Sequence, residues 1–458
     1  MNHYQLLVIG AGPGGYTAAL QAAKLGLRTA IVERREVGGT CLNRGCIPTK
    51  ALLHAAQIYH EAQSGGEAGI LAQDLQLDLP AMFAHQRKIT ETLRSGVEGL
   101  LRNAKVELIP GSAAITAPNT VQVERDGERR TFTAERILIA TGSEPAMPPI
   151  PGLELAMTSD QILQGMDRPY RSIVIIGGGV IGVEFASFFR QLGCQVTILE
   201  GLDRLLPNLD RELGQNLAQL FKKQGLNVYT NAMVQAVEPG QDGLTVRFQG
   251  KTGPGAATAE KVLCAIGRRP AWAGLFPGDL QPETEGRRIR VDSRFATSIP
   301  GVYAIGDVSS TIQLAHVAAA QGTACVNLMW GKPVGMDLSI VPSCIYCRPE
   351  IASVGLTEAQ AKAAGIPAKI GKCTLFSNAR TMIANPGRSF IKLVAHSETH
   401  EMLGAQLMCE HSTDMISQIS LAMANHLTAQ QLLLAMRPHP TFEEAMADAL
   451  EDLIRKLG

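Results

Sequence analysis

Residues 6–15 read LLVIGAGPGG, an apolar run that leads into the glycine spacing GxGxxG. A helical pattern, a second apolar run and then Glu33 follow it. This order of strand, glycine turn, helix, strand and acid is typical of a dinucleotide-binding fingerprint. Gly10 allows the tight turn, Gly12 lets the backbone approach a pyrophosphate, and Gly15 lets helix and strand pack closely. We expect a pyrophosphate at the helix N-terminus and ribose hydroxyls at Glu33.

The same pattern begins again at residues 172–176, which read SIVII. The second set of glycines is Gly177, Gly179 and Gly182, and Glu200 ends the strand after the helix. Two fingerprints indicate two dinucleotide sites. No arginine follows Glu200 at the next two positions, and its carboxylate would repel a 2′-phosphate, so the second site favours NAD over NADP.

Three further apolar runs lead into a glycine: ILIATG at 137–142, VLCAIG at 262–267 and VYAIGD at 302–307, in which Asp307 follows the glycine. Asp307 closes the last run and, like Glu33, would point at a ribose or polyol of a cofactor; an ordinary turn aspartate is the alternative. Four prolines at 145–151 indicate a linker. Beyond Pro333 the chain changes to alternating strands and then to helices from Ser412, which predicts an α+β domain without a fingerprint of its own.

Residues 38–50 read GGTCLNRGCIPTK and place Cys41 and Cys46 five positions apart. We expect Pro48 to loosen the turn between them, because it cannot donate to the carbonyl of Arg44. A disulfide over a distorted turn is readily exchanged, which suits a catalytic pair. Lys50 would lie one turn beyond Cys46 on the same helix face. Two unrelated thiols near a loop are the alternative interpretation.

Composition excludes several classes of function. The 458 residues are enough for about three domains, and Lys plus Arg equals Asp plus Glu at 42 each. This balance gives no field that favours nucleic acid or an anionic membrane, and 5% aromatic residues offer few stacking surfaces. No signal-like N-terminal segment is visible, so nine cysteines predict a cytoplasmic protein with mostly reduced thiols, in which any disulfide is catalytic.

One histidine stands in restricted surroundings. His439 lies between Pro438 and Pro440, and Glu444 follows five residues later, at a distance that would let it orient the imidazole. A pair of surface residues without function is the alternative.

Taken together, the motifs resemble those of the FAD-dependent pyridine nucleotide–disulfide oxidoreductases over nearly the whole chain, and most of all the dihydrolipoyl dehydrogenases among them. The motifs are GAGPGG, GGTCLNRGCIPTK, LIATGS, GGGVIGVE, AIGRRP, YAIGDV and HPTFEEA. The resemblance implies an α/β fold with two Rossmann-like domains. FAD would bind to residues 1–147 and 271–336, and NAD to residues 148–270. Residues 337–458 would form an α+β dimerisation domain.

The resemblance also assigns residues to the cofactors. For FAD they are Gly10, Gly12, Gly15, Glu33, Gly39, Thr40, Lys50, Ala113, Thr141, Gly142, Gly306, Asp307 and Ala315. For NAD they are Gly177, Gly179, Gly182, Glu200, Val234 and Gly267. No metal site is implied.

The implied chemistry is the oxidation of protein-bound dihydrolipoamide, with electrons passing from the Cys41–Cys46 pair through FAD to NAD⁺. Cys41 would exchange with the substrate, and Cys46 would meet the flavin as a thiolate. Lys50 and Glu184 would pair beside the flavin. His439, oriented by Glu444, would be the base and would serve the partner subunit of a homodimer. The expected partner is the lipoyl-bearing component of a 2-oxo acid dehydrogenase or glycine cleavage complex.

Three departures from the family pattern bear on the substrate. Arg44 stands where relatives carry an apolar residue; its charge would lower a thiol pKa or attract an anionic group, and a solvated arginine is the alternative. Arg437-Pro438 replaces His-Ala at the expected substrate mouth. Cys344 and Cys347 form a C-x-x-C, which we interpret as two ordinary thiols rather than a second redox pair or a metal half-site.

The remaining alternatives are other members of the family and one scaffold. Glutathione reductases would carry arginines after Glu200, mercuric reductases end in a cysteine pair whereas this chain ends IRKLG, and a flavoprotein transhydrogenase would lack the Cys41–Cys46 pair. Reduction of a different disulfide or thiol-binding substrate by NAD(P)H stays open. A non-catalytic FAD-binding scaffold would not need Cys41, Cys46, His439 and Glu444 together.

Overall fold

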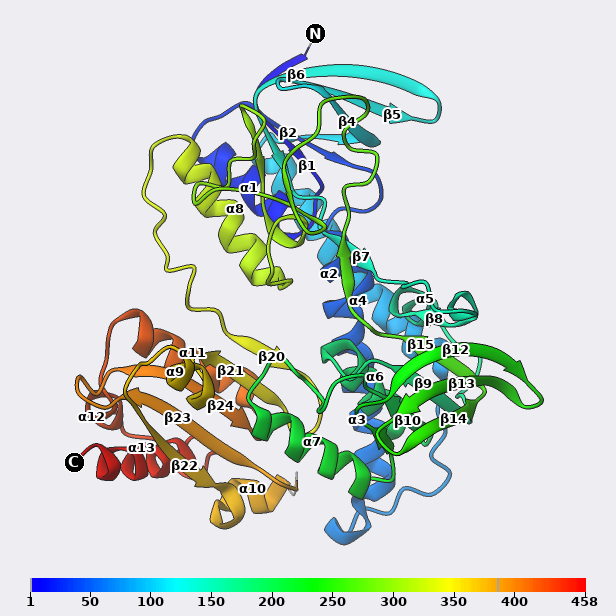
Figure 1. The fold of residues 1–458 in the computed structure, drawn as a ribbon, viewed down its shortest axis with the longest axis vertical. Coiled ribbons are helices and arrows are strands. Elements are labelled where there is room, and N and C mark those ends of the chain that lie inside the picture. Colours follow the sequence, from blue (N-terminus) through cyan, green and yellow to red (C-terminus); the bar gives the residue numbers. More distant parts are fainter. Residues whose placement is uncertain (1, 385–386) are drawn as a thin grey trace.

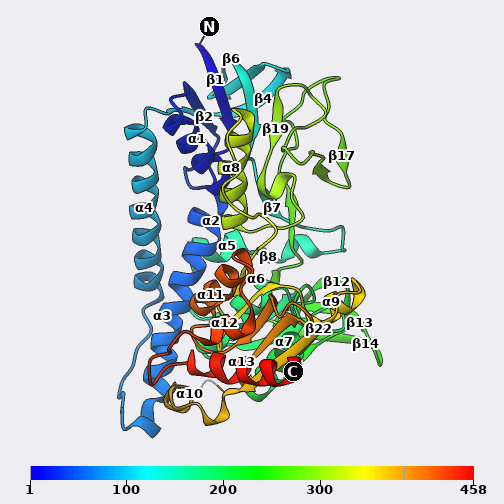
Figure 2. The same cartoon turned by 90° about the vertical axis from the view of Figure 1, so that its left-hand side faces the viewer.

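The computed structural model describes residues 2–384 and 387–458 and folds them around three main β-sheets. In Figure 1 the first sheet lies at the top with the N-terminus, the second at the lower right, and the third at the lower left with the C-terminus. Figure 2 shows two long helices, α3 (Cys46–Ser64) and α4 (Leu79–Asn103), along one side of the molecule. None of the helices in the described residues carries an apolar stretch long enough to cross a membrane.

The first sheet contains the first fingerprint. Its strand order is β3-β2-β1-β6-β5-β4, and β19 pairs with the end of β6. The residues of the LLVI run are fully or almost fully buried, because one face of the sheet packs against the helices at 13–24 and 315–329 and the other against apolar residues at 115–123 and 275–299. The strands are β1 (Asn2–Ile9), β2 (Thr29–Glu33), β3 (Glu107–Pro110), β4 (Ser112–Ala117), β5 (Thr120–Arg125), β6 (Glu128–Ile139) and β19 (Val302–Ala304).

The second sheet contains the second fingerprint and repeats the arrangement of the first. All five of its strands are parallel in the order β11-β10-β9-β15-β8, and an antiparallel meander β12-β13-β14 follows β11 in the chain. The strands are β8 (Met157–Thr158), β9 (Ser172–Ile176), β10 (Gln195–Leu199), β11 (Asn227–Tyr229), β12 (Met233–Gly240), β13 (Gly243–Gly250), β14 (Gly253–Ala259) and β15 (Lys261–Cys264).

The chain crosses between these two units twice, and the crossings pair with each other. Strand β7 (Ser143–Pro145) leaves the first sheet and pairs antiparallel with β16 (Arg268–Pro270), which returns from the second. The first part of the proline-rich linker is therefore a short strand. A small hairpin of β17 (Thr284–Glu285) and β18 (Arg288–Ile289) follows the return.

The third sheet is antiparallel in the order β20-β21-β24-β23-β22, as the alternating pattern after Pro333 predicts. Its strands are β20 (Ser343–Ile345), β21 (Ile351–Gly355), β22 (Ala368–Thr374), β23 (Phe390–His396) and β24 (Met402–Met408). Helices α11 (Ser412–Ala424), α12 (Ala429–Leu433) and α13 (Glu444–Leu457) pack on it and complete a separate hydrophobic core.

The remaining helices place the functional segments. They are α1 (Pro13–Lys24), α2 (Gly39–Arg44), α5 (Ser159–Gln164), α6 (Val180–Gln191), α7 (Arg211–Lys223), α8 (Ala315–Met329), α9 (Glu358–Ala363) and α10 (Ala379–Ala384), with 3₁₀ turns at Gly65–Ala68, Leu153–Leu155, Gly306–Val308 and Leu375–Ser377. Helices α3 and α6 share one core in which Leu52 and Ala56 accompany Val183 and Phe185. This contact holds the two fingerprint units together.

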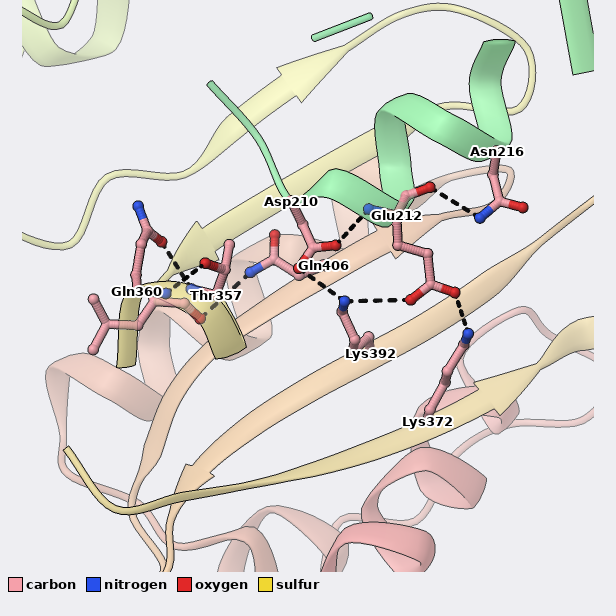
Figure 3. Close-up of polar contacts among 9 residues, drawn as sticks. Asp210, Glu212, Asn216, Thr357, Gln360, Lys372, Lys392 and Gln406 are labelled. Atoms are coloured by element: carbon pink, nitrogen blue, oxygen red, sulfur yellow. Dashed lines mark hydrogen bonds and ion pairs between the residues drawn. The ribbon is translucent and has the colours of Figure 1, made fainter. Parts of the chain in front are cut away.

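A buried ion pair ties the second unit to the third sheet (Figure 3). Asp210 caps the start of α7, and its carboxylate lies 2.8 Å from Lys392 Nζ on β23. Both side chains are nearly inaccessible to solvent. Glu212 is 3.3 Å from the same Nζ and also pairs with Lys372 on β22. The third sheet therefore holds α7 by charge as well as by apolar contact.

Candidate active site

The two cysteines of the 38–50 stretch lie on either side of a helix break. Helix α2 ends at Arg44, Gly45 is non-helical at φ −146° and ψ −111°, and α3 begins at Cys46. The expectation that Pro48 loosens this turn is wrong, because Pro48 sits in the first turn of α3, where its missing N–H costs nothing. A Cβ at residue 45 would lie 3.0 Å from the carbonyl oxygen of Thr40, so glycine permits the close approach.

The structure holds Cys41 and Cys46 as a pair of thiols in contact. Their hydrogen bond raises the pKa of Cys41 well above its ordinary value, and burial adds to that rise. The same hydrogen bond lowers the pKa of Cys46 to about 7, and the positive charge of Lys50 lowers it further. Partial desolvation by the surrounding protein, although the residue keeps some exposed surface, and the carboxylate of Glu184 oppose that shift. Cys46 is therefore the sulfur that carries the thiolate near neutral pH.

Lys50 and Glu184 form an ion pair beside these thiols. Lys50 Nζ donates to both carboxylate oxygens of Glu184, at 2.8 and 2.7 Å, and Glu184 is almost fully buried. The backbone N–H of Tyr346 donates to the same carboxylate at 3.1 Å, and the Tyr346 ring lies 4.8 Å from Lys50 Nζ. A buried carboxylate is stable here because two donor groups, the Lys50 ammonium and the Tyr346 N–H, make three hydrogen bonds to it.

A second chain of polar groups lies close to Cys46. Ser143 Oγ donates to Asp307 Oδ2 at 2.5 Å, and Arg268 donates to the hydroxyl and carbonyl oxygens of Ser143, each at 2.8 Å. Burial raises the pKa of Asp307, against the effects of Ser143 and Arg268. Burial also lowers the pKa of Arg268, which the charges of Asp160, Asp307 and Cys46 counteract. Asp307 is thus fixed by neighbours rather than free in a turn.

The first fingerprint has the geometry that its glycines predict. Gly10 has φ +103°, and a Cβ on Gly15 would lie 1.8 Å from the carbonyl oxygen of Gly10, so no larger residue fits there. The carboxylate of Glu33 accepts from the backbone N–H groups of Ala11 at 2.7 Å and Arg35 at 2.8 Å. Gly39 enters the site at φ +60°, close against Gly12.

The second fingerprint repeats these contacts 167 positions later. Gly177 has φ +110°, and a Cβ on Gly182 would lie 2.0 Å from its carbonyl oxygen, whereas Gly179 has open space. Glu200 accepts from the N–H groups of Gly178 at 2.5 Å and Leu202 at 2.8 Å. The first arginine after Glu200 is Arg204, which is held by Asp203 and by the Pro207 carbonyl.

The remaining residues predicted to bind cofactors include three glycines with positive φ. Gly142 and Gly306 have φ of +70° and +69°, and Gly267 has φ +129° with open space beside it. The others are Thr40 on α2, Ala113 on β4, Thr141 before Gly142, Val234 on β12 and Ala315 at the start of α8. The Thr141 hydroxyl oxygen is buried without a hydrogen-bond partner among the described residues. An orphaned polar atom beside a left-handed glycine and the N-terminus of α1 fits a bound dinucleotide.

His439 and Glu444 also form a pair, but away from the cysteines. His439 Nδ1 is 2.8 Å from Glu444 Oε1, and Glu444 Oε2 accepts from the Thr441 N–H at 2.9 Å. The Thr441 hydrogen bond, followed by that of His439, lowers the pKa of Glu444. Figures 1 and 2 both show α13, which begins at Glu444, well apart from α2. Within one described chain no hydrogen bond or ion pair joins residues 438–444 to α2 or α3.

Two of the departures from the family pattern have structural explanations. The side chain of Arg44 pairs with Glu36 and lies 3.9 Å from Asp160, so its charge is compensated rather than directed at the thiols. Arg437 donates to the carbonyls of Ala435 and Leu432 at the end of α12. Its side chain therefore satisfies carbonyl groups at that helix end.

The C-x-x-C thiols have separate surroundings. Cys344 Sγ lies 3.7 Å from the Thr413 carbonyl oxygen, and Cys347 Sγ lies 3.3 Å from that of Pro349. Burial raises the pKa of both, to about 11 for Cys344. No cluster of potential metal ligands occurs among the described residues. The different contacts of the two sulfur atoms and the raised pKa of each thiol favour two ordinary thiols.

Sequence reasoning missed three polar residues of this site: Ser143, Arg268 and Tyr346. Ser143 and Arg268 each follow a motif glycine directly, which is the signal that could have identified them. Tyr346 reaches Lys50 and Glu184 only through the packing of the third sheet, and no local pattern indicates that contact.

Comparison with known proteins agrees with this geometry. Residues 4–322 match the model of the pyridine nucleotide-disulphide oxidoreductase family, and residues 341–450 match that of its dimerisation domain. A dihydrolipoyl dehydrogenase of Bacillus subtilis is 37% identical, covering 98% of this chain and 97% of its own. Dihydrolipoyl dehydrogenase 3 of Pseudomonas aeruginosa is 39% identical, and the match covers 99% of this chain and 98% of that protein. The HOCl-induced flavoprotein disulfide reductase RclA of Escherichia coli superposes over both whole chains with a TM-score of 0.86 and 30% identity.

The chain therefore belongs to the pyridine nucleotide–disulfide oxidoreductase family. It is a flavin-dependent oxidoreductase with a redox-active disulfide, and its cofactors are FAD and NAD.

Proposed function

We propose that this enzyme oxidises protein-bound dihydrolipoamide to lipoamide and reduces NAD⁺ to NADH, which is the activity of a dihydrolipoyl dehydrogenase. The observation that carries the proposal is the placement of Cys46, whose pKa is lowered to about 7, beside Cys41 and the Lys50–Glu184 pair. The two named relatives with this activity match nearly the full length of the chain.

The two fingerprints hold different cofactors in this proposal. FAD lies in residues 1–147 and 271–336, with its pyrophosphate at the start of α1 and its ribose or polyol hydroxyls at Glu33 and Asp307. NAD lies in residues 148–270 at the start of α6, with its ribose at Glu200. The β7–β16 crossing supports the boundaries at 147 and 271. Residues 337–458 form the dimerisation domain.

Cys41 and Cys46 divide the chemistry between them. In the oxidised enzyme a substrate thiolate attacks Cys41 Sγ, a new S–S bond forms, and Cys46 leaves as a thiolate. The second substrate thiol then displaces Cys41, so the substrate departs as a disulfide and its electron pair stays on the cysteines. Lys50 stabilises the Cys46 thiolate. Bound FAD supplies a two-electron acceptor that passes the pair to NAD⁺ as hydride.

The thiol assigned to the substrate is less exposed than the thiol assigned to the flavin. Cys46 is exposed and Cys41 is partly buried in the chain alone, although Cys41 is assigned to the substrate. FAD held beside Cys46 would cover the exposed part of this residue and would leave Cys41 as the thiol that exchanges with the substrate.

His439 removes the proton from the substrate thiol, and Glu444 orients its imidazole. Because the pair lies apart from α2 within one chain, we propose that it acts in the partner subunit of a homodimer. Leu434 and Met436, which precede His439, are 84% and 98% exposed, as expected for residues that a partner covers. The remaining proposed partner is the lipoyl-bearing component of a 2-oxo acid dehydrogenase or glycine cleavage complex, in the cytoplasm.

A second candidate function is the reduction of a different disulfide or thiol-binding substrate by NAD(P)H. The likeness to the disulfide reductase of Escherichia coli over the whole chain favours it. The two candidates differ in which dithiol exchanges with Cys41, and so in which compound reduces the enzyme.

Anaerobic titration of the purified flavoprotein with dihydrolipoamide tests the proposal. We expect a long-wavelength charge-transfer band from Cys46, which NAD⁺ then removes as NADH appears. A Cys46→Ser variant is the control and should give no band. If NADH produces the band in the unmodified protein and dihydrolipoamide does not, the disulfide relay stands and the second candidate replaces the first.

A further inference from the structure

A cavity of about 250 Å³ lies between α3, α6, the end of α7 and the segment after β20, and the proposed reaction does not use it. Its lining residues come from α3, α6, the end of α7 and the segment after β20, and they are His60, Ser187, Arg190, Gln191, Lys223, Gln224 and Arg348. None of these described lining residues is acidic, and three of them are permanently cationic at neutral pH. The cavity therefore has the electrostatics of an anion site.

Two buried polar atoms in this cavity have no partner. Ser187 is 6% exposed, and its hydroxyl oxygen makes no hydrogen bond within the described residues. The side-chain oxygen of Gln191, one turn further along α6, is also buried and unpaired. Buried hydroxyl and amide groups are nearly always hydrogen-bonded, so two orphans that line one cavity indicate a ligand that satisfies them.

The cations are only partly compensated. Arg348 pairs with Glu61 at 2.7 Å and lies 3.2 Å from Glu410, so two carboxylates adjoin the cavity from outside its lining. Arg190 donates from Nε to the Gln224 carbonyl at 2.6 Å. Because that acceptor is neutral, the bond does not compensate the charge of Arg190. Among the described residues, neither Arg190 nor Lys223 forms an ion pair with a carboxylate.

We propose that this cavity binds a phosphate group, either inorganic phosphate or the phosphate of a small monoester. Arg190, Lys223 and Arg348 supply the positive charge, and the Ser187 hydroxyl donates to a phosphate oxygen. The Gln191 oxygen accepts from a protonated phosphate oxygen or from a hydroxyl of the ester. A cavity of about 250 Å³ has room for a small phosphate ion or monoester.

The position of this site relates it to the redox centre. Helices α3 and α6 supply residues to both sites. Lys50 on α3 and Glu184 on α6 form the ion pair, and His60 and Ser187 line the cavity further along the same two helices. Arg348 follows two residues after Tyr346, which contacts both members of that ion pair. A ligand in the cavity would thus bridge the elements that position Cys46.

A calorimetric titration of the FAD-loaded enzyme with inorganic phosphate tests the proposal. Saturating NAD⁺ is present throughout, so that the second fingerprint cannot account for the binding. We expect saturable binding that Lys223→Gln weakens by about tenfold, the effect of losing one charge contact at an intermediate dielectric. Ser187→Ala should weaken it severalfold. Lys222→Gln is the matched control, because Lys222 carries the same charge next in sequence and does not line the cavity.

His60 gives a second readout that does not depend on a variant. Burial, Arg348 and Arg190 lower the pKa of His60, whereas Glu61 opposes them, and Lys223 faces it from α7. A bound phosphate adds negative charge, so the pKa of His60 measured by NMR should rise on titration.

Comparison of inorganic phosphate with glycerol 3-phosphate distinguishes the source. Tighter binding of the ester identifies a monoester ligand, and equal binding identifies the free ion. The proposal is overturned by an absence of saturable binding, or by equal weakening in Lys222→Gln and Lys223→Gln, which would reveal general charge attraction. It does not depend on which dithiol is the substrate.

Discussion

Lys50 Nζ lies 2.7 Å from Glu184 Oε2, and this contact joins the helix that begins with Cys46 to the helix that begins at the second fingerprint. The positive charge of Lys50 neutralises the buried carboxylate of Glu184 and also stabilises the Cys46 thiolate. Removal of Lys50 and removal of the Glu184 charge should therefore shift the pKa of Cys46 in opposite directions.

The first prediction concerns the pKa of Cys46. Lys50 lowers this pKa and Glu184 raises it, so Lys50→Met should shift the thiolate titration of the reduced enzyme upward from about 7. Glu184→Gln should shift it downward. We expect each shift to be about one pH unit, or roughly 1.4 kcal/mol. Absorbance of the thiolate against pH gives the measurement, with thiol below the midpoint and thiolate above it.

Arg44→Gln is the control for this prediction. Arg44 is close in sequence to both thiols but is paired with Glu36, so the titration should not move. A shift as large as that of Lys50→Met would restore the hypothesis that the Arg44 charge acts on the thiols.

The second prediction separates the two sulfur atoms. The hydrogen bond from Cys41 is the largest cause of the lowered Cys46 pKa. Cys41→Ser keeps a donor and should retain thiolate absorbance near neutral pH, whereas Cys41→Ala removes the donor and should raise the titration midpoint. Spectra of the two variants between pH 6 and 10 (roughly the range around the ordinary thiol pKa) would show the difference. Identical midpoints would mean that the hydrogen bond does not control the thiolate.

The third prediction separates the half-reactions. His439→Gln removes the proposed base, so reduction of the enzyme by dihydrolipoamide should slow by about 10²- to 10⁴-fold. Flavin reduction by NADH does not require that base and should keep its rate. Glu444→Gln should slow the dithiol step by less, because the histidine stays in place. Stopped-flow measurement of both half-reactions tests this, and equal losses in both would point to a folding defect instead.

The fourth prediction concerns stability. Lys392→Met leaves the Asp210 carboxylate buried without its cation, which should cost about 3 kcal/mol of unfolding free energy. Lys372→Met breaks a half-exposed pair on the neighbouring strand and should cost roughly 0.5 kcal/mol. Urea denaturation of the FAD-loaded protein gives both values. The double change Lys392→Met with Asp210→Asn should recover part of the loss; failure to recover would assign the cost to packing.

The sequence predicted best the features that depend on local order. The two fingerprints, the acids Glu33 and Glu200 and the change to an antiparallel domain follow from apolar runs and glycine spacing. Each of these patterns is contained in a short continuous segment, so its structure depends mainly on residues that are close in sequence. The pairing of Lys50 with Glu184 followed from family resemblance, since 134 positions separate them.

The sequence predicted poorly where the fold brings distant segments together. For Arg44 the sequence left open a solvated arginine or a charge that acts on a thiol or an anionic group, and it placed Arg437 at the expected substrate mouth. Neither pattern indicates the acceptors that the fold supplies, which are Glu36 for Arg44 and carbonyl groups at the end of α12 for Arg437. The break between the cysteines was attributed to Pro48 although the contact between residue 45 and Thr40 decides it. Such contacts depend on packing that a linear pattern does not contain.

The separation of His439 from Cys46 within one chain has a genetic consequence. If His439 serves the site of the partner subunit, as proposed, a gene copy with Cys46→Ser and another with His439→Gln would each encode an inactive homodimer, whereas their mixed dimer would contain one site with both residues intact. Random assembly makes half of the dimers mixed, so co-expression should restore about one quarter of the normal activity. Two recessive loss-of-function alleles at this single locus would therefore complement each other, whereas two alleles that both affect residues 38–50 would not.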